Sequence, residues 1–119
     1  HVLPARNRLR ESGQFRAVLR GPGASRAGGP LIVVHVALTD PRGVRAPRVG
    51  FVVSGAVGGA VVRNRVKRRL RHLVAARLSG MPRGCDLVVR AAPAAAGAQF
   101  GELERELDRC LTRALAKVG

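Results

Sequence analysis

The sequence predicts a small α+β protein, a sandwich of helices packed on a sheet. Three segments repeat apolar residues at helical spacing, three others have the length and β-branched content of strands, and no internal repeat is present. Their order along the chain is α-β-β-α-β-α. A chain of 119 residues with 46% apolar content can bury roughly two thirds of its unfolded surface in one core. We therefore expect a single domain over residues 1–119.

The first part of the chain is expected to hold one helix, one loop and one strand. Residues 11–20 form the helix, with Ser12 as its cap and Phe15 among its apolar residues. Four glycines and two prolines make residues 21–30 a loop. Residues 31–38 are almost continuously apolar, which is typical of a strand covered on both faces.

Two more strands and two more helices follow. Alternating apolar residues predict a strand over residues 48–54, which we expect to form an antiparallel hairpin with the preceding strand. A long helix over 58–78, a strand over 85–91 and a loose alanine-rich linker over 91–98 come next. The last helix, 99–117, has one apolar stripe and is expected to be structural. This stripe consists of Phe100, Leu103, Leu107, Cys110, Leu111 and Leu115.

The net charge of +15 is unevenly distributed. Residues 1–40 carry a net +4, residues 41–85 carry +11 with no acidic side chain, and residues 86–119 are neutral. Of the 22 cationic side chains 20 are arginine, whose planar guanidinium matches phosphate oxygens. A compositional bias toward arginine is the alternative, but bias alone does not remove acids from only one third of a chain. The middle third is therefore the predicted binding surface.

Several classes of protein are excluded at this stage. The longest apolar stretch, residues 31–38, is far shorter than the ~20 residues that cross a bilayer, and no signal peptide is evident. We expect a soluble, cytoplasmic protein without a membrane partner. Cys85 and Cys110 have no second cysteine or histidine at ligand spacing, which favours two buried thiols over a zinc site or a disulfide framework.

The helix over residues 58–78 is the most informative segment. At ~100° per residue its apolar side chains form one stripe, and the polar ones divide into two groups. Cationic side chains lie at i, i+4 from one another, which destabilises the helix unless an anion is bound. Because two sides of the helix are basic, we expect it to lie between two polyanionic surfaces. The stripe is Val62, Val66, Leu70 and Leu73. One group is Asn64, Lys67 and Arg71 with Arg63 beside it, and the other is Arg65, Arg68, Arg69 and His72.

The run Arg63-Asn-Arg-Val-Lys-Arg-Arg-Leu-Arg71, preceded by Gly59-Ala-Val-Val62, resembles the signature helix of the bacterial ribonuclease P protein family. The resemblance spans nearly the whole chain, with further matches at Arg8, Leu9, Phe15, Arg48, Val49, Gly50 and Ser54. It implies a central mixed sheet like that of one domain of a small-subunit ribosomal protein. It also implies a left-handed crossover around the basic helix, against the usual right-handed rule.

The resemblance implies a function in which the catalyst is an RNA. The protein assists that RNA, in a 1:1 complex, to remove the 5′ leader from precursor tRNA, and the RNA rather than a dedicated protein site holds Mg²⁺. No residue of the chain is then catalytic. The resemblance implies that Arg63, Arg65 and Arg68 contact the catalytic RNA. Arg69 and His72 are added to this set because they share a side of the helix with Arg65 and Arg68. The implied contacts to the leader are Phe15, Leu19, His35, Asn64, Lys67 and Arg71.

Some positions depart from the family pattern, and other functions were weighed. Leu19 and His35 stand where aromatic residues are frequent, so stacking on the leader is expected to rest on Phe15. Core packing is the alternative for Phe15 and His35. Seven acids, five of them within the last 34 residues, cannot supply a two-metal nuclease site on the basic surface. No acid, nucleophile or second histidine is near His72 in the sequence to make it a catalytic base. A structural RNA-binding protein of the ribosomal type and, less favoured, a DNA-binding protein remain alternatives.

Overall fold

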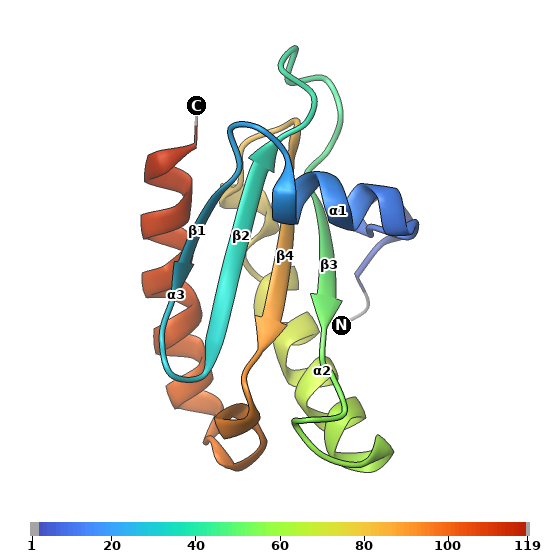
Figure 1. Ribbon diagram of the computed structural model, residues 1–119. Helices are drawn as coiled ribbons and strands as arrows, with labels where there is room; N and C mark the ends of the chain where they lie inside the picture. Colours follow the sequence, from blue (N-terminus) through green and yellow to red (C-terminus); the bar gives the residue numbers. More distant parts are fainter. Residues whose placement is uncertain (1–2, 119) are drawn as a thin grey trace.

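The computed structural model describes residues 3–118 and confirms the predicted α+β class (Figure 1). It contains three α-helices and a four-stranded mixed sheet, together with short 3-10 helices in the connections. The helices are α1 (Ser12–Arg20), α2 (Ala60–Ala75) and α3 (Phe100–Lys117). The strands are β1 (Ser25–Gly28), β2 (Ile32–Leu38), β3 (Arg48–Val52) and β4 (Cys85–Ala91). The 3-10 helices are η1 (Ala5–Asn7), η2 (Leu78–Gly80) and η3 (Pro93–Gly97).

The sheet order is β1-β2-β4-β3, so the predicted hairpin between the second and third strands is wrong. β4 lies between them, antiparallel to β2 and parallel to β3. Its first five residues are all buried, which makes it the natural central strand. Apolar alternation predicts that a segment is a strand but does not encode its neighbour, and for this reason the sequence pattern favoured the simpler hairpin.

β1 was predicted to be part of a loop and is instead an edge strand paired with β2. It contains Gly28 and no β-branched or aromatic residue, so its strand propensity is low and its pairing depends on tertiary contacts. One such contact is the buried carboxylate of Glu106 on α3, which accepts hydrogen bonds of 2.7 Å from the backbone N–H groups of Leu31 and Ile32 just beyond the turn. The hydroxyl of Ser25 likewise donates to the carbonyl of Ala114 on α3.

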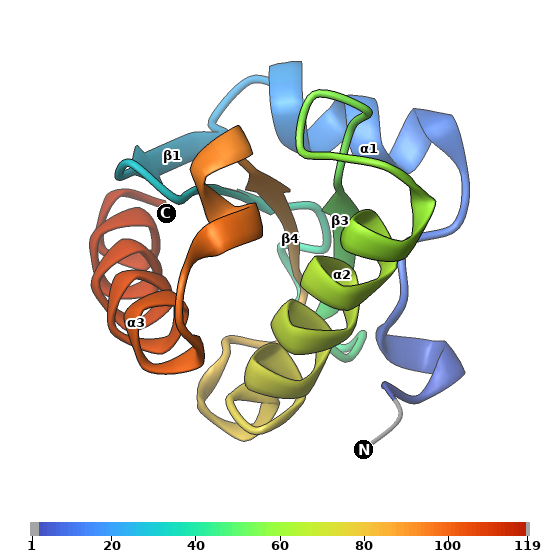
Figure 2. The same cartoon turned by 90° about the horizontal axis from the view of Figure 1, so that it is seen from below.

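The helices cover both faces of the sheet. α1 packs on one face, and α2 and α3 pack on the other (Figure 2). The parallel strands β3 and β4 are joined through α2, and with α2 behind the sheet in Figure 1 this connection is left-handed. The implied handedness is therefore confirmed. The larger core lies between the sheet and the helices α2 and α3, while Val18 of α1 packs against Val88 on the opposite face.

Several predicted boundaries change in the structure. α1 begins at Ser12 with Glu11, not Ser12, as its N-cap. α2 ends at Ala75, before the predicted residue 78, because Leu78–Gly80 turns into a 3-10 helix. The predicted loose linker is also wrong in part, since Pro93–Gly97 forms an ordered 3-10 helix whose Ala95 is fully buried.

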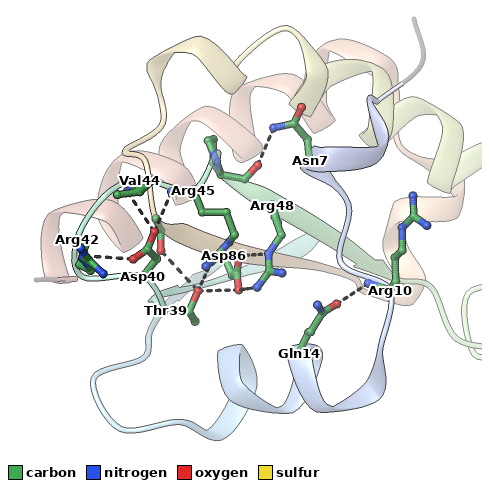
Figure 3. Close-up of polar contacts among 12 residues, drawn as sticks. Asn7, Arg10, Gln14, Thr39, Asp40, Arg42, Val44, Arg45, Arg48 and Asp86 are labelled. Carbon is green, nitrogen blue, oxygen red and sulfur yellow. Dashed lines mark hydrogen bonds and ion pairs between the residues drawn. The ribbon is translucent and has the colours of Figure 1, made fainter.

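A buried ion-pair network joins β3 to β4 (Figure 3). The carboxylate of Asp86, 1% exposed, accepts hydrogen bonds of 2.9 and 2.7 Å from Arg48, 3.0 Å from Arg45 and 2.8 Å from the hydroxyl of Thr39. Burial by itself would raise the pKa of Asp86, but the hydrogen bonds from Arg48 and Thr39 and the charge of Arg48 outweigh burial and lower it. The network holds the start of β3 beside β4.

Candidate nucleic-acid interface

The basic surface is built on α2, which is docked on the sheet by its apolar stripe. Val66, Leu70, Leu73 and Val74 are buried, and Val62 is partly buried against the same core. The chain turns into the helix at Gly58, whose positive φ of 156° and contact with Val62 exclude a larger residue. At the other end Arg77 donates to the carbonyl of Leu73 and pairs with Glu104 and Asp108 of α3. The helix is thus fixed at both ends.

One side of α2 faces the edge strand β3 and helix α1. Lys67 and Arg71 border a hollow of about 180 Å³ together with Phe15 of α1 and Gly50 of β3. The ring of Phe15 lies directly on the backbone of β3, because a Cβ added to Gly50 would be 2.3 Å from Phe15 Cε2. The structure therefore brings an aromatic ring of α1 and two cations of α2 to one hollow, as the sequence analysis grouped them.

The opposite side of α2 faces η3 and the start of α3. The guanidinium groups of Arg65 and Arg69 donate to the backbone carbonyls of Ala96 and Ala98, at 3.1 and 3.2 Å. The ring of His72 lies 5.9 Å from that of Phe100, centroid to centroid. These contacts hold three side chains of the second predicted group in place. Sequence analysis missed the role of η3, because alanine and glycine give no sign that their carbonyls orient arginines.

The other predicted leader contacts occupy different places. Leu19 borders a second hollow of about 650 Å³, which also includes Phe15 and Val52, so Phe15 lies between the two hollows. His35 is on the same sheet face but is buried, 5% exposed, with its Nε2 atom unpartnered. Asn64 is exposed on α2 and borders neither of these two hollows. The structure thus brings Phe15, Lys67 and Arg71 together, and does not join His35 and Asn64 to them.

Two cations that sequence analysis did not single out lie beside His35. Arg26 is its partner across β1 and β2, and Arg90 is two residues beyond Val88, its partner on β4. Burial lowers the pKa of His35, and the charges of Arg90 and Arg26 lower it further, so its imidazole is neutral at pH 7. Side chains alternate between the two faces of a strand, so a correct prediction of β1 would have placed Arg26 and Arg90 on the same sheet face as His35.

The acidic side chains of the protein interact with groups other than the cations of α2. All seven acidic side chains accept hydrogen bonds or form ion pairs within the protein. They are Glu11, Asp40, Asp86, Glu102, Glu104, Glu106 and Asp108. Within residues 3–118 none of the six cations of α2 forms an ion pair. The acids stabilise the fold, and the charge of α2 is left for an external anion.

The described residues form neither a metal-binding cluster nor a membrane-spanning helix. Among the described residues no group of three or more His, Cys, Asp or Glu side chains is arranged to hold a metal ion. None of the helices formed by residues 3–118 has the length and apolar character needed to span a bilayer. Cys85 and Cys110 are buried and unpaired, and burial raises the pKa of Cys85 to about 11.

The fold and this surface define an α+β protein that binds a polyanion through one docked, acid-free helix. Comparison with known proteins specifies the family. The family model described as Ribonuclease P matches residues 3–115. A ribonuclease P protein component of Streptomyces bikiniensis is 56% identical over 121 residues, covering 96% of each chain. One of Nocardioides sp. is 50% identical over 117 residues, covering 98% of each. The chain therefore belongs to the ribonuclease P protein family.

Solved structures agree on the fold. The RNase P protein of Staphylococcus aureus superposes with a TM-score of 0.79 at 23% identity, covering 94% of this chain and 96% of that chain. The RNase P protein of Thermotoga maritima gives a TM-score of 0.72 at 23% identity, covering 86% and 92%. The predicted family resemblance and mixed-sheet architecture are both confirmed.

Proposed function

We propose that this protein is the RNA-binding subunit with which a catalytic RNA removes the 5′ leader from precursor tRNA. The observation that carries the proposal is the two-sided helix α2. One side meets an aromatic ring at the hollow of Phe15, and the other is oriented by the carbonyls of η3. A helix placed between two RNA surfaces needs both sides, whereas a protein that binds one RNA needs only one. Membership of the ribonuclease P family supports the same conclusion.

Each RNA is assigned its own set of side chains, and Arg63, which lies beside the leader group, is assigned to the catalytic RNA. The catalytic RNA contacts Arg63, Arg65, Arg68, Arg69 and His72. The leader contacts Phe15, Leu19, His35, Asn64, Lys67 and Arg71, and the sheet face adds Arg26 and Arg90 beside His35. Bases of the single-stranded leader stack on Phe15 while Lys67 and Arg71 neutralise its phosphates. Because His35 is buried, its contribution is to position the sheet face.

The contribution of the protein to cleavage is electrostatic. A net charge of +15 between two RNAs reduces their repulsion, which otherwise has to be screened by Mg²⁺. The carboxylates are occupied by protein partners, so the Mg²⁺ ions used in the reaction are assigned to the RNA. The protein works in the cytoplasm and binds the catalytic RNA 1:1.

The proposal is tested by cleavage of a precursor tRNA by a bacterial ribonuclease P RNA at low Mg²⁺, with and without the protein. We expect the protein to stimulate release of an intact 5′ leader. A control in which the RNA is omitted is expected to show no cleavage. If the folded protein binds the RNA but does not stimulate cleavage, it is a structural RNA-binding protein instead.

Replacing Phe15 by alanine is expected to weaken binding of precursor tRNA about tenfold and binding of mature tRNA less than about twofold, since base stacking contributes ~1–3 kcal/mol. The affinities are measured with the assembled RNA–protein complex, in which mature tRNA differs by lacking the leader. Phe15→Leu keeps apolar contact with β3 and serves as the matched variant for folding. Equal losses for the two tRNAs would remove Phe15 from the leader site.

A further inference from the structure

Phe100 is the exception in the apolar stripe of α3. The stripe residues Leu103, Leu107, Cys110 and Leu111 are all buried, but Phe100 is 39% exposed. It is the first residue of α3, where the chain leaves η3, and it faces α2 rather than the centre of the core. A large aromatic ring kept partly in water at this corner is not explained by core packing.

The surroundings of Phe100 are cationic. Its ring meets that of His72 at 5.9 Å with an interplanar angle of 59°. Arg65, Arg69 and His72 follow each other at i, i+4 and i+7 and so share one side of α2. The carbonyls that hold Arg65 and Arg69 belong to Ala96 and Ala98, four and two residues before Phe100. The exposed ring is therefore on the side of α2 that carries two arginines whose guanidinium groups are already oriented.

The nearest acid along the chain is Glu102, which accepts a hydrogen bond of 2.8 Å from the backbone N–H of Gln99 at the start of α3. Among residues 3–118 it forms no ion pair with an arginine of α2. Neither Arg65 nor Arg69 forms an ion pair among residues 3–118. A guanidinium group carries five N–H donors, and Arg65 and Arg69 each use one of them for a backbone carbonyl. The arginines therefore retain donors for an anion on this side of α2.

We propose that Phe100 is a stacking platform for one unpaired base of the catalytic RNA, with Arg65 and Arg69 holding the adjacent phosphates. Proteins that recognise RNA loops and bulges stack unstacked bases on aromatic rings and neutralise the flanking backbone with arginine. The site takes a nucleotide rather than a protein segment, because a single ring bordered by cations matches a base and its phosphates. This inference rests on the proposed function and adds a base contact to a surface otherwise assigned to phosphates.

The test is binding of the full protein to the ribonuclease P RNA in the absence of tRNA. Phe100→Leu keeps an apolar side chain but removes the aromatic face, and we expect about tenfold weaker binding, within the range for loss of one stacked base. Phe100→Tyr restores the ring and is expected to bind as the original chain does. Leu38→Ala is the matched control, because Leu38 is 41% exposed at the end of β2 and lies outside the basic segment 41–85.

A second measurement separates stacking from a general loss of stability. Ultraviolet irradiation of the complex is expected to cross-link the RNA to the tryptic peptide 91–105, which contains Phe100. Chemical probing is expected to show one unpaired nucleotide that the original chain and Phe100→Tyr protect and that Phe100→Leu leaves reactive. Unchanged affinity and protection with Phe100→Leu would overturn the stacking site. If the original chain itself fails to bind the RNA, the proposed function fails and not only this inference.

Discussion

Replacing Arg65 and Arg68 together by glutamine is expected to weaken binding to the catalytic RNA about a hundredfold. Each loss removes a charge-assisted hydrogen bond to phosphate, for which ~1.5 kcal/mol, or about tenfold, is a reasonable value. Arg65 is oriented by η3, and Arg68 is exposed on the same helix, so both are available to one RNA surface. The affinity is measured as a function of salt, where the slope of log K against log salt should fall by about two.

Cleavage by the same double variant is expected to require more Mg²⁺ for half-maximal rate. The matched control replaces Arg105 and Arg113, which are exposed on α3 and lie outside the basic segment 41–85. This control lowers the net charge equally, so it reports the general electrostatic effect alone. Should both double variants shift the Mg²⁺ dependence by the same amount, the position of the arginines on α2 is irrelevant.

Replacing Asp86 by alanine is expected to lower the free energy of unfolding by about 3 kcal/mol, since removing one partner of a buried ion pair leaves the others uncompensated. This value is at the low end of the usual range because the side chains of Arg48 and Arg45 are 20% and 33% exposed and can regain water. Urea denaturation at pH 7 measures the change. Asp108→Ala is the control, because the exposed pair with Arg77 contributes less than about 1 kcal/mol.

The contribution of Asp86 also depends on pH. Its pKa is lowered in the folded protein, so its stabilisation is fully present above the ordinary aspartate pKa near 4 and is lost as pH falls through the lower folded value. We expect the stability of the original chain to fall in this acid range more steeply than that of Asp86→Asn. Parallel curves for the two proteins would show that the ionised carboxylate is not what stabilises β3 beside β4.

The sequence predicted the central features of the site because they are local. The stripe Val66, Leu70 and Leu73 follows from 3.6 residues per turn and is buried as predicted. The structure also places Lys67 and Arg71 on one side of α2 and Arg65 and Arg69 on the other. The absence of acids from residues 41–85 identified the basic surface before any fold was known. The assignment of these side chains to RNA contacts remains a prediction.

The errors share one physical cause, which is that long-range contacts are not encoded in local pattern. Gly28 and its neighbours have little strand propensity. β1 is nevertheless a strand because its backbone pairs with β2 and the hydroxyl of Ser25 donates a hydrogen bond to α3. The sequence analysis joined the wrong strands, since β4 comes later in the chain but has the most buried residues. It also included Phe100 in the apolar stripe of the last helix by helical spacing, but Phe100 is the first residue of α3 and is not buried with the rest of the stripe.

The sequence by itself therefore determined the class of fold, the apolar stripe that docks α2 and the positive charge of its two polar sides. Charge and periodicity are properties of the chain. Only the tertiary structure decided which partners those sides meet. Phe15 lies beside Lys67 and Arg71, and the carbonyls of η3 lie beside Arg65 and Arg69, because the left-handed connection places α2 between two segments distant in sequence. The two surfaces that define the proposed function are thus made by packing.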